Sequence, residues 1–575
     1  MLPRRLSALF SVVLCLFTAP FVQAQHDQTL KALEDAMPRL LEEGNVPGLS
    51  IAVIRDGALI WNKAFGVKSL ETNAPVDNET IFEAASLSKP VFAYAVLRMV
   101  ERNEFNLDVP LAAHLKYERL AHDERYRQIT ARMVMSHSTG MPNWGGDRLN
   151  LNFDPGTAFN YSGEGFVYLQ KTLEHLTGLT LDELVQREVF EPLGMTRSSY
   201  VWQDEFEANA VARHSSQGNV SPIRRPTQGN AAASLMTTAA DYARFLGAIV
   251  QSEGLEAETV DAMLRPEMSV VSSTMGNEGE AKQKNSWGLG WGLHPMEAGH
   301  AFWHWGDNGD AKAFTMTDYG SGNGFVYFAN SNDGLSLGDA IAGYVFGEPA
   351  WGLRWLNYEQ HDDPRRIARK TMVRAYIEDG IEAGRATYDD LRERQPDVVD
   401  ERLVNALGYE LLGGDHVEAA IAVFQCNVDA YPESSNVYDS LGEVFLRARD
   451  YEKALRNYEK SVELDPNNKG GVRSIDWIKA RIEVENHPVT VPVETLQRYA
   501  GDYGPRHVVL DGATLFYQRD GNPRYRLIPL ADDLFALDGL ETFRMRFVAD
   551  DEGRIVKIVG HYINGNQDET PRDSF

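Results

Sequence analysis

A repeat with a period of 34 residues limits the fold of this chain more than any other feature of its sequence. Five residues recur at that spacing, in the pairs Leu407/Leu441, Gly408/Gly442, Ala420/Ala454, Phe424/Tyr458 and Pro432/Pro466. A unit of this length accommodates two helices, with a small residue where they touch and a proline after the second. Such units must stack on one another to bury their apolar faces. Because the chain has 575 residues, more than one core can hold, further domains must flank the repeats.

The repeat resembles the tetratricopeptide repeat. With the helical pattern at residues 472–485 it predicts a short solenoid, and an ordinary pair of helical hairpins is the alternative. The resemblance implies a surface that could hold a peptide or protein partner. We assign residues 361–487 to a helical linker and these repeats.

Short strand-like segments follow His487-Pro488, and their turns contain Asp-Gly or Gly. They predict a small antiparallel barrel or sandwich over residues 488–575. This region resembles the lipocalin-like domain often appended to certain serine hydrolases, but it indicates no chemistry by itself. The strand-like segments are residues 507–512, 513–518, 524–530, 533–539, 543–550 and 553–563.

The first 24 residues have the pattern of a bacterial-type signal peptide. Arg4 and Arg5 precede an apolar run, and Val22-Gln23-Ala24 has the form of a cleavage site. We expect export to the periplasm or medium, an uncleaved membrane anchor being the alternative. Only Cys426 would remain of the two cysteines, so no disulfide is expected within the mature chain.

The net charge of the chain excludes some classes of partner. It is −27 for the whole sequence, and removal of Arg4 and Arg5 with the leader makes it −29. Such a charge repels nucleic acid and anionic membrane surfaces, so we expect neither as a partner after cleavage.

Residues 25–360 carry the pattern of an α+β domain with an antiparallel sheet and a helical region. Residues 47–65 predict two strands around the turn Arg55-Asp56-Gly57, and helical segments alternate with loops to about residue 251. Strand-like patterns occur again in the segments WGLGWGL, FWHWG and GFVYFANS. Strands at both ends of the domain predict one sheet that joins segments distant in the sequence.

Ser86 and Lys89 form a Ser-x-x-Lys pattern at the start of a predicted helix. Spaced three residues apart, the two side chains would lie on one face, close enough to touch. Serine is a weak nucleophile until a neighbour takes its proton, and a desolvated lysine could do so. An N-cap serine followed by a solvated lysine is the alternative. Pro90 disfavours helical backbone at Lys89, so an irregular turn is expected here.

Two later motifs give this pair its meaning. Tyr161 follows a proline-glycine loop and precedes a helical pattern, where its phenol could relay the serine proton if nearby cations lower its pKa. A packed aromatic is the alternative. His304-Trp305-Gly306 is the only His-x-Gly in the chain. Glycine on an edge strand lets a ligand backbone approach, although a lone histidine on a strand is usually structural.

In this order the three motifs resemble those of serine hydrolases related to class C β-lactamases, DD-peptidases and family VIII-type esterases, over about residues 28–346. The resemblance implies that Ser86 is acylated, that Lys89 and Tyr161 move its proton, and that His304 contacts the substrate. It also implies an oxyanion hole near Gly306, formed by the backbone N–H groups of Ser86 and Asp307. The expected substrate is a small ester or amide, and the resemblance implies no cofactor.

Two departures from the family pattern weaken the assignment of a substrate. Gly163 stands where many relatives that cleave amides have asparagine, and His304 stands where many β-lactamases have lysine. A catalytically silent binding protein that uses its repeats to hold a partner is therefore the alternative function. A metal site at His300 and His304 is disfavoured, because four residues of strand would separate the two side chains by roughly 13 Å.

Overall fold

The computed structural model of the protein describes residues 28–296 and 299–573. The expected signal peptide, residues 1–24, lies outside the described residues. The chain divides into two compact units, the first ending at Asp363 and the second beginning at Pro364. Within the described part of the chain, every helix is too short or too polar to cross a membrane.

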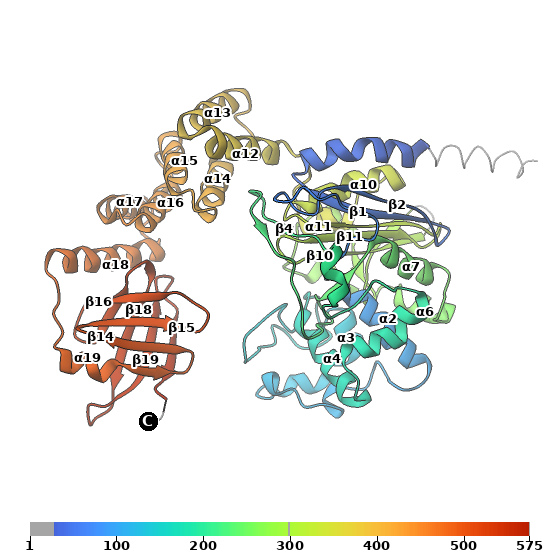
Figure 1. Cartoon of the computed structure of the whole chain (residues 1–575), viewed down its shortest axis with the longest axis horizontal. Coiled ribbons are helices and arrows are strands. Elements are labelled where there is room, and N and C mark those ends of the chain that lie inside the picture. The colour runs from blue at the N-terminus through green and yellow to red at the C-terminus, as the bar shows by residue number, and fades with distance from the viewer. Residues whose placement is uncertain (1–27, 297–298, 574–575) are drawn as a thin grey trace, which may run out of the picture. The chain divides into compact units, whose positions relative to one another are not determined.

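An eight-stranded antiparallel sheet forms the centre of the first unit (Figure 1). Its strand order, β2-β1-β12-β11-β10-β9-β8-β7, places the first strands beside the last. The α+β prediction, with one sheet joining distant segments, is therefore confirmed. The strands are β1 (Gly48–Arg55), β2 (Ala58–Gly66), β7 (Met268–Ser269), β8 (Ser286–Trp287), β9 (Gly292–Met296), β10 (Gly299–Asp307), β11 (Lys312–Asp318) and β12 (Asn323–Ala329).

The turn between β1 and β2 shows how the local sequence sets the register. Asp56 and Gly57 both have positive φ, 49° and 73°, as a two-residue hairpin with the twist of its strands requires. Arg55 consequently faces Ala58. The hairpin expected from Arg55-Asp56-Gly57 is present.

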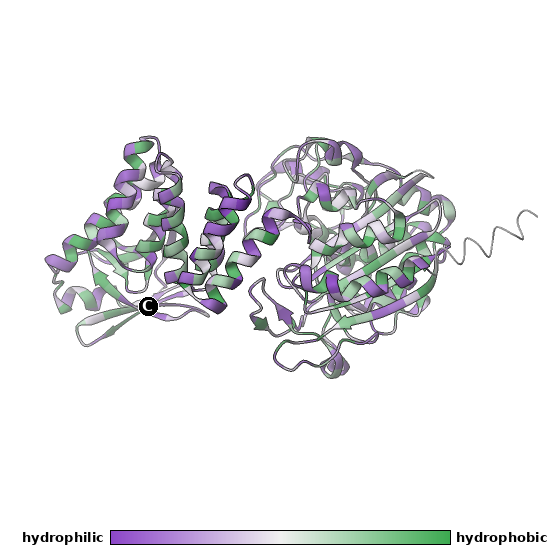
Figure 2. Cartoon of the chain, turned by 90° about the horizontal axis from the view of Figure 1, so that it is seen from above, coloured by the Kyte–Doolittle hydropathy of each residue, from purple (hydrophilic) through white to green (hydrophobic). Residues whose placement is uncertain are grey.

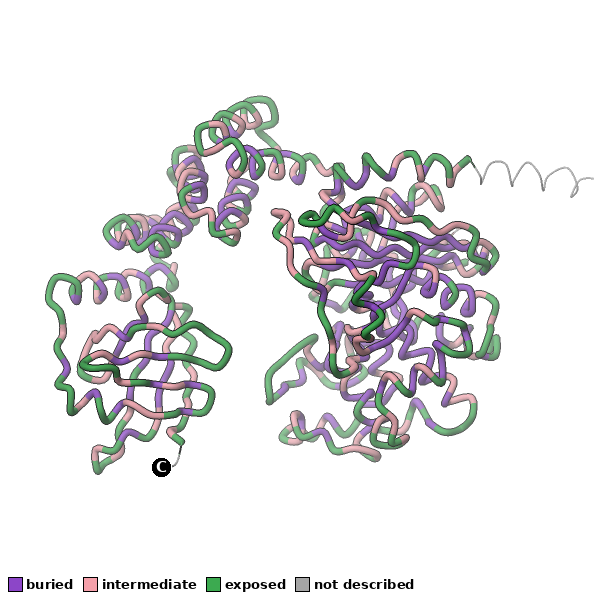
Figure 3. Tube along the Cα trace, viewed as in Figure 1, coloured by how far each residue is buried: buried purple, intermediate pink, exposed green. Residues whose placement is uncertain are grey.

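Both faces of the sheet are covered, because successive strand residues point to opposite sides. Ile51 and Val53 pack in one cluster with residues of helix 28–43, α10 (Gly338–Phe346) and α11 (Trp351–Leu356). Ala52 and Ile54 pack in another with residues of α2 (Ser88–Glu101), α4 (Gly163–Thr177) and α7 (Ala239–Val250). The central strands β1, β11 and β12 are accordingly buried (Figure 3) and largely hydrophobic (Figure 2), whereas the edge strand β2 is exposed or half-buried.

The second cluster belongs to a helical region inserted between β2 and β7. Two small sheets brace it, β3 (Phe82–Ala85) with β6 (Leu235–Thr237) and β4 (Arg213–His214) with β5 (Val220–Ser221). Its remaining α-helices are α3 (Ala131–Met135), α5 (Leu181–Val185), α6 (Glu191–Leu193) and α8 (Ala257–Met263), and α9 (Glu280–Lys284) follows between β7 and β8.

The second unit begins with helical hairpins that have the predicted period. A side chain at Gly408 would come within 2.5 Å of the Phe424 ring, and one at Gly442 within 3.0 Å of Tyr458, so each glycine lets two helices touch. The helices are α12 (Pro364–Arg374), α13 (Ile381–Arg394), α14 (Glu401–Gly413), α15 (Val417–Ala430), α16 (Ser435–Arg447), α17 (Tyr451–Leu464), α18 (Lys469–Asn486) and α19 (Val493–Tyr499).

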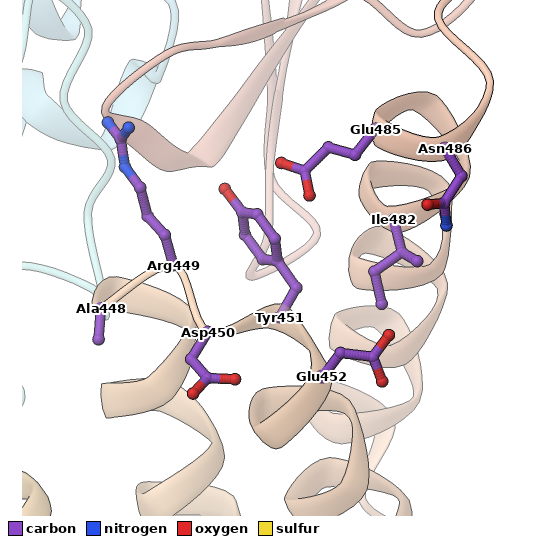
Figure 4. A pocket seen from close by; sticks show the side chains of 8 residues that line it. All are labelled: Ala448, Arg449, Asp450, Tyr451, Glu452, Ile482, Glu485 and Asn486. Carbon is purple, nitrogen blue, oxygen red and sulfur yellow. The ribbon is translucent and has the colours of Figure 1, made fainter.

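A pocket of about 460 Å³ opens between the α16–α17 turn and the end of α18. Figure 4 shows the side chains of Tyr451 and Glu485 approaching each other from α17 and α18. The Tyr451 hydroxyl lies 3.3 Å from Nε of the buried Arg481, which fixes this wall.

The unit ends in an antiparallel sheet that forms a nearly closed barrel with a filled interior. After β20 the chain returns to β13, where Asp573 N–H donates to the carbonyl of Asp502 at 3.0 Å. The barrel prediction is confirmed, although the sequence indicated neither β13 nor β20. The strands are β13 (Gly501–Tyr503), β14 (Arg506–Asp511), β15 (Thr514–Arg519), β16 (Arg524–Pro529), β17 (Leu534–Leu537), β18 (Leu540–Ala549), β19 (Ile555–Tyr562) and β20 (Gln567–Pro571).

Candidate active site

Ser86 lies in a two-residue turn between β3 and α2. Among residues 81–97, all of which the structure describes, it is the only one that is not buried. Ala85, directly before it, has φ +48°, a left-handed conformation that costs a non-glycine residue about 1–2 kcal/mol. The turn therefore holds one hydroxyl at the surface of an otherwise closed core.

The start of α2 differs from both expectations for this turn. Leu87 is the N-cap and no side chain caps the helix, so the interpretation of Ser86 as a capping residue is wrong. The irregularity expected from Pro90 is also absent at Lys89, which lies within α2. Proline in the first turn of a helix removes no hydrogen bond, because that N–H has no partner inside the helix.

Lys89 is completely buried, and its Nζ lies 2.8 Å from Ser86 Oγ and 2.8 Å from the carbonyl oxygen of Ala232. The alternative of a solvated lysine is therefore wrong. Burial lowers the pKa of Lys89 well below its ordinary value, because desolvation penalises the ammonium form. A neutral amine here can donate one hydrogen to Ala232 and direct its lone pair at the Ser86 hydroxyl.

Tyr161 lies beside the same amine, with its ring centroid 4.7 Å from Lys89 Nζ. Its phenol oxygen is buried and has no hydrogen-bond partner among the described residues. Burial raises the pKa of Tyr161 well above its ordinary value, and Ser86 offsets only part of the rise. The expectation that nearby cations lower this pKa is wrong, because desolvation dominates. The phenol keeps its proton and is suited to donate it.

His137 is a site residue that the sequence reasoning missed. It lies in the segment MSHSTGMP, is completely buried, and packs against Tyr161 with ring centroids 4.2 Å apart and ring planes tilted by 36°. Its carbonyl accepts from Asn160 N–H at 2.8 Å, and its Nδ1 accepts from Ser162 N–H at 3.1 Å. His137 thus forms hydrogen bonds with the residues on both sides of Tyr161, Asn160 and Ser162. The backbone of His137 has an unusual φ of +55°, and no pattern in the sequence reveals such a conformation.

His304 is also buried, beside Tyr161 on β10. Its Nδ1 lies 2.8 Å from the Trp305 carbonyl, and its Nε2 has no partner among the described residues. Burial lowers its pKa well below the ordinary value, so the ring is neutral. The ring of His304 packs against Tyr161 and Trp287. Of the predicted site residues, His304 therefore best fits the alternative in which a histidine on a strand has only a structural role.

Gly306 serves a different purpose from the one expected. β10 lies between β9 and β11, but its pairing with β9 ends at Trp303, so Gly306 lies where β10 has a free edge. A Cβ at Gly306 would lie 2.4 Å from the carbonyl oxygen of Ala84 and 3.1 Å from the Ala85 side chain. The space that was expected to admit a ligand therefore holds the backbone of the Ser86 turn, and Gly306 lets the sheet contact that turn.

The backbone N–H of Asp307 points away from β11. Asn308 N–H donates to the Ala311 carbonyl, so the next pair, Asp307 with Lys312, is a non-hydrogen-bonded pair of the ladder. On the other side the pairing with β9 ends at Trp303, which leaves this N–H uncovered by a strand.

The Asp307 carboxylate is held away from that N–H by its own partners. It contacts Lys312 Nζ at 2.5 Å and accepts from the Tyr358 hydroxyl at 2.8 Å. Burial would raise its pKa, but Lys312 and these hydrogen bonds hold the pKa below its ordinary value. The Asp307 carboxylate is therefore charged and bound to Lys312 and Tyr358.

Comparison with known proteins assigns this first unit to a family. The sequence profile of the family described as Beta-lactamase matches residues 32–346, more than half of the chain. The chain belongs to the beta-lactamase family. In the second unit, the profile described as Tetratricopeptide repeat matches residues 435–468, which confirms the resemblance of the repeats.

Individual relatives of this beta-lactamase-family chain are distant. Penicillin-binding protein 4 of Amycolatopsis lactamdurans is 24% identical over 377 residues, which are 60% of this chain and 97% of that protein. Protein flp of Staphylococcus aureus (strain MRSA252) is 20% identical over 314 residues, 51% of this chain, and the match spans only 61% of the staphylococcal protein. The D-alanine carboxypeptidase AmpC from Burkholderia cenocepacia is 17% identical with a TM-score of 0.47, covering 56% of this chain and 99% of that one.

Gly163, the departure from the family pattern, lies under an indole ring. A Cβ at this position would be 2.7 Å from the Trp144 side chain, and the Gly163 N–H donates to Asn143 Oδ1 at 2.9 Å. A side-chain amide therefore still lies at the start of α4, but it comes from Asn143. Trp144 is half exposed and covers the space that an asparagine side chain would fill.

Gly306→Ala should damage the site through the backbone. Because the added methyl meets the Ala84 carbonyl, we expect the free energy of unfolding to fall by about 1–3 kcal/mol and the reactivity of Ser86 to fall with it. Gly343→Ala on α10 is the matched control, since a Cβ there meets nothing within 4 Å. Thermal unfolding and active-site labelling would measure both variants, and equal behaviour of the two would contradict this account of Gly306.

His137→Phe should loosen Tyr161. The change keeps an aromatic ring but removes the acceptor of Ser162 N–H, which costs about 1–3 kcal/mol for a buried donor left unpaired. We expect a lower melting temperature and slower labelling of Ser86. If the variant melted earlier but its Ser86 reacted at the wild-type rate, His137 would not position Tyr161.

Proposed function

We propose that this protein is an exported serine hydrolase that forms an acyl-enzyme on Ser86 and hydrolyses small esters or amides. One observation carries the proposal: the hydroxyl of half-buried Ser86 lies 2.8 Å from the completely buried amine of Lys89. Membership of the beta-lactamase family, whose members are serine hydrolases, supports the same reaction. Export rests on the pattern of residues 1–24 alone.

The first step is attack by Ser86 Oγ on the substrate carbonyl carbon, while its proton passes to neutral Lys89. Ala232 holds the amine in line by accepting its other hydrogen. The carbonyl oxygen then carries a negative charge, which the N–H groups of Ser86 and Asp307 stabilise as two fixed donors. Loss of one such donor typically raises the barrier by about 2.7–4 kcal/mol.

Collapse of the tetrahedral intermediate breaks the bond to the leaving group, which needs a proton. Tyr161 is a protonated phenol beside both Ser86 and Lys89, so it donates that proton and regains one from Lys89. Water then attacks the acyl-enzyme through the same groups in reverse. The balance is one water consumed, and one acid and one alcohol or amine released.

The substrate class is proposed as small esters or amides such as D-amino-acid peptides. The printed name of the Amycolatopsis relative, penicillin-binding protein 4, makes β-lactams a further class for the same pocket. The second function is a silent binding protein whose repeats hold a partner. Gly163 favours it, because the amide that orients amide substrates in relatives is absent from that position. The described residues contain no group of three or more His, Cys, Asp or Glu side chains that could hold a metal ion.

A fluorescent phosphonate should label the wild-type protein at Ser86 and should not label Ser86→Ala. Lys89→Arg is the sharper variant, because arginine keeps a long side chain with N–H donors but stays protonated and cannot act as a base. We expect it to lower the labelling rate and ester turnover by about 10²- to 10⁴-fold. Equal labelling of the wild type and Ser86→Ala would contradict the nucleophile, and normal turnover in Lys89→Arg would contradict the base.

The pH dependence of kcat/KM follows from the two shifted groups. Lys89 must lose its proton to act, so activity should rise with pH through its pKa, which burial lowers. It should not fall again at pH 10, because burial raises the pKa of Tyr161 and keeps the phenol protonated. Initial rates with a 4-nitrophenyl ester from pH 5 to 10 test this, and a flat or falling profile would disprove the assignment.

A further inference from the structure

We infer that the substrates of this protein carry a carboxylate, which Arg224 binds in a pocket beside Ser86. The inference rests on the proposed function and adds a substrate class to it. The pocket has a volume of about 390 Å³ in the first unit. Glu83, Arg224, Arg225, Asn230, Ala233 and Asn308 are among the residues that line it.

The walls of this pocket come from the segments that form the reaction centre. Ala233 follows Ala232, whose carbonyl accepts from Lys89. Asn308 follows Asp307, whose N–H was assigned to the oxyanion hole, and its Nδ2 donates to the Ala233 carbonyl at 3.2 Å. Glu83 lies on β3, which leads directly into the Ser86 turn. These shared segments place the pocket next to the turn that holds Ser86 and the strand end that holds Asp307.

Glu83 organises the pocket but its charge is already compensated. The residue is 3% exposed, and its carboxylate accepts from Asn308 Nδ2 at 2.9 Å and from Arg224 N–H at 3.2 Å. Nε of Arg213 lies 3.7 Å from the same carboxylate. A buried carboxylate with this many partners fixes the wall and leaves little negative charge to repel an anion.

Arg225 is not available to a ligand. Its guanidinium makes a bidentate contact with Glu207, at 2.7 and 3.1 Å, and lies over the Trp202 ring. Arg225 and Glu207 therefore cancel each other at the rim.

Arg224 is the cation that remains. Its side chain is 54% exposed, and its Nη2 donates only to the backbone carbonyl of Asn308, at 3.2 Å. Its Nε is 3.9 Å from Glu83, beyond a hydrogen bond. The charged residues that line the pocket are Arg224, Arg225 and Glu83, which leave one net positive charge in a chain whose net charge is −27.

One planar guanidinium with free donors matches one carboxylate, which it can bind through two parallel hydrogen bonds. A single net charge fits a singly charged carboxylate better than a dianionic phosphate. The pocket also offers uncharged donors beside the arginine, in Gln228 and Asn230. We therefore assign the site to a carboxylate on the part of the substrate that lies over Asn308.

Paired esters test the assignment on either side of the scissile bond. Mono-4-nitrophenyl adipate carries the anion on the acyl side, and 4-nitrophenyl hexanoate is its neutral counterpart. The pair 4-(hexanoyloxy)benzoate and 4-carbamoylphenyl hexanoate places the anion on the leaving group. We expect the wild type to prefer one of the anionic esters, and the ratio of kcat/KM values for that pair to fall at least about tenfold in Arg224→Gln.

Two further variants separate charge from structure. Arg224→Lys should keep part of the preference, because it keeps the charge but loses the planar fork. Arg39→Gln, on helix 28–43 where Arg39 pairs with Glu43, should leave the ratio unchanged. An anionic preference that is absent from the wild type, or equal in Arg224→Gln, would overturn the inference.

Binding to Ser86→Ala separates this inference from the proposed hydrolysis. Calorimetric titration of Ser86→Ala with the adipate monoester should show tighter binding than in the double variant Ser86→Ala/Arg224→Gln. If that difference is present but the wild type hydrolyses no ester, the carboxylate site stands and the hydrolase proposal fails. If neutral esters are hydrolysed through Ser86 but Arg224 affects neither measurement, the hydrolase stands and the carboxylate site fails.

Discussion

The burial of one amine beside one hydroxyl is the constraint on which the rest of this site depends. An ammonium group is costly to remove from water, so Lys89 at zero exposure favours its neutral form. The apolar helix α2 supplies that burial, and the Ser86 turn supplies the opening to solvent. The same burial raises the pKa of Tyr161. One low-dielectric environment thus produces a base and an acid within reach of the same oxygen.

The sheet takes part in the chemistry through a backbone contact. Gly306 brings β10 against the Ala84 carbonyl, and the next residue offers its N–H where no strand covers it. The sheet itself depends on pairing between β1 and β12, nearly three hundred residues apart in the chain. Stability of the whole first unit is therefore coupled to the position of a single donor.

The sequence predicted the components of this site better than their electrostatic state. Ser86, Lys89 and Tyr161 could be found because their spacing and order form motifs. The pKa direction of Tyr161 could not, because it depends on how many atoms from other segments surround the phenol. His137 was missed for a similar reason: its hydrogen bonds reach residues 160 and 162, which only the tertiary structure brings close.

The fold shows the same division. Several strands with aromatic or β-branched patterns were predicted, but β11 was not, because its sequence KAFTMTD is short and has charged residues at both ends. The edge strands β13 and β20 are short and carry polar residues, so their pattern is that of loops. In the repeats even the positions of single glycines could be predicted, because each repeat makes the same contact between its two helices.

The left-handed backbone of Ala85 has a consequence for how this protein divides its free energy. The conformation belongs to the folded backbone itself, so the cost of bending the chain at this point is incurred once, when the polypeptide folds. No catalytic cycle has to repeat it. The strained backbone at Ala85 lowers the stability of the fold but holds Ser86 in place for reaction. Selection for a faster enzyme would therefore keep this strain at the expense of thermal stability.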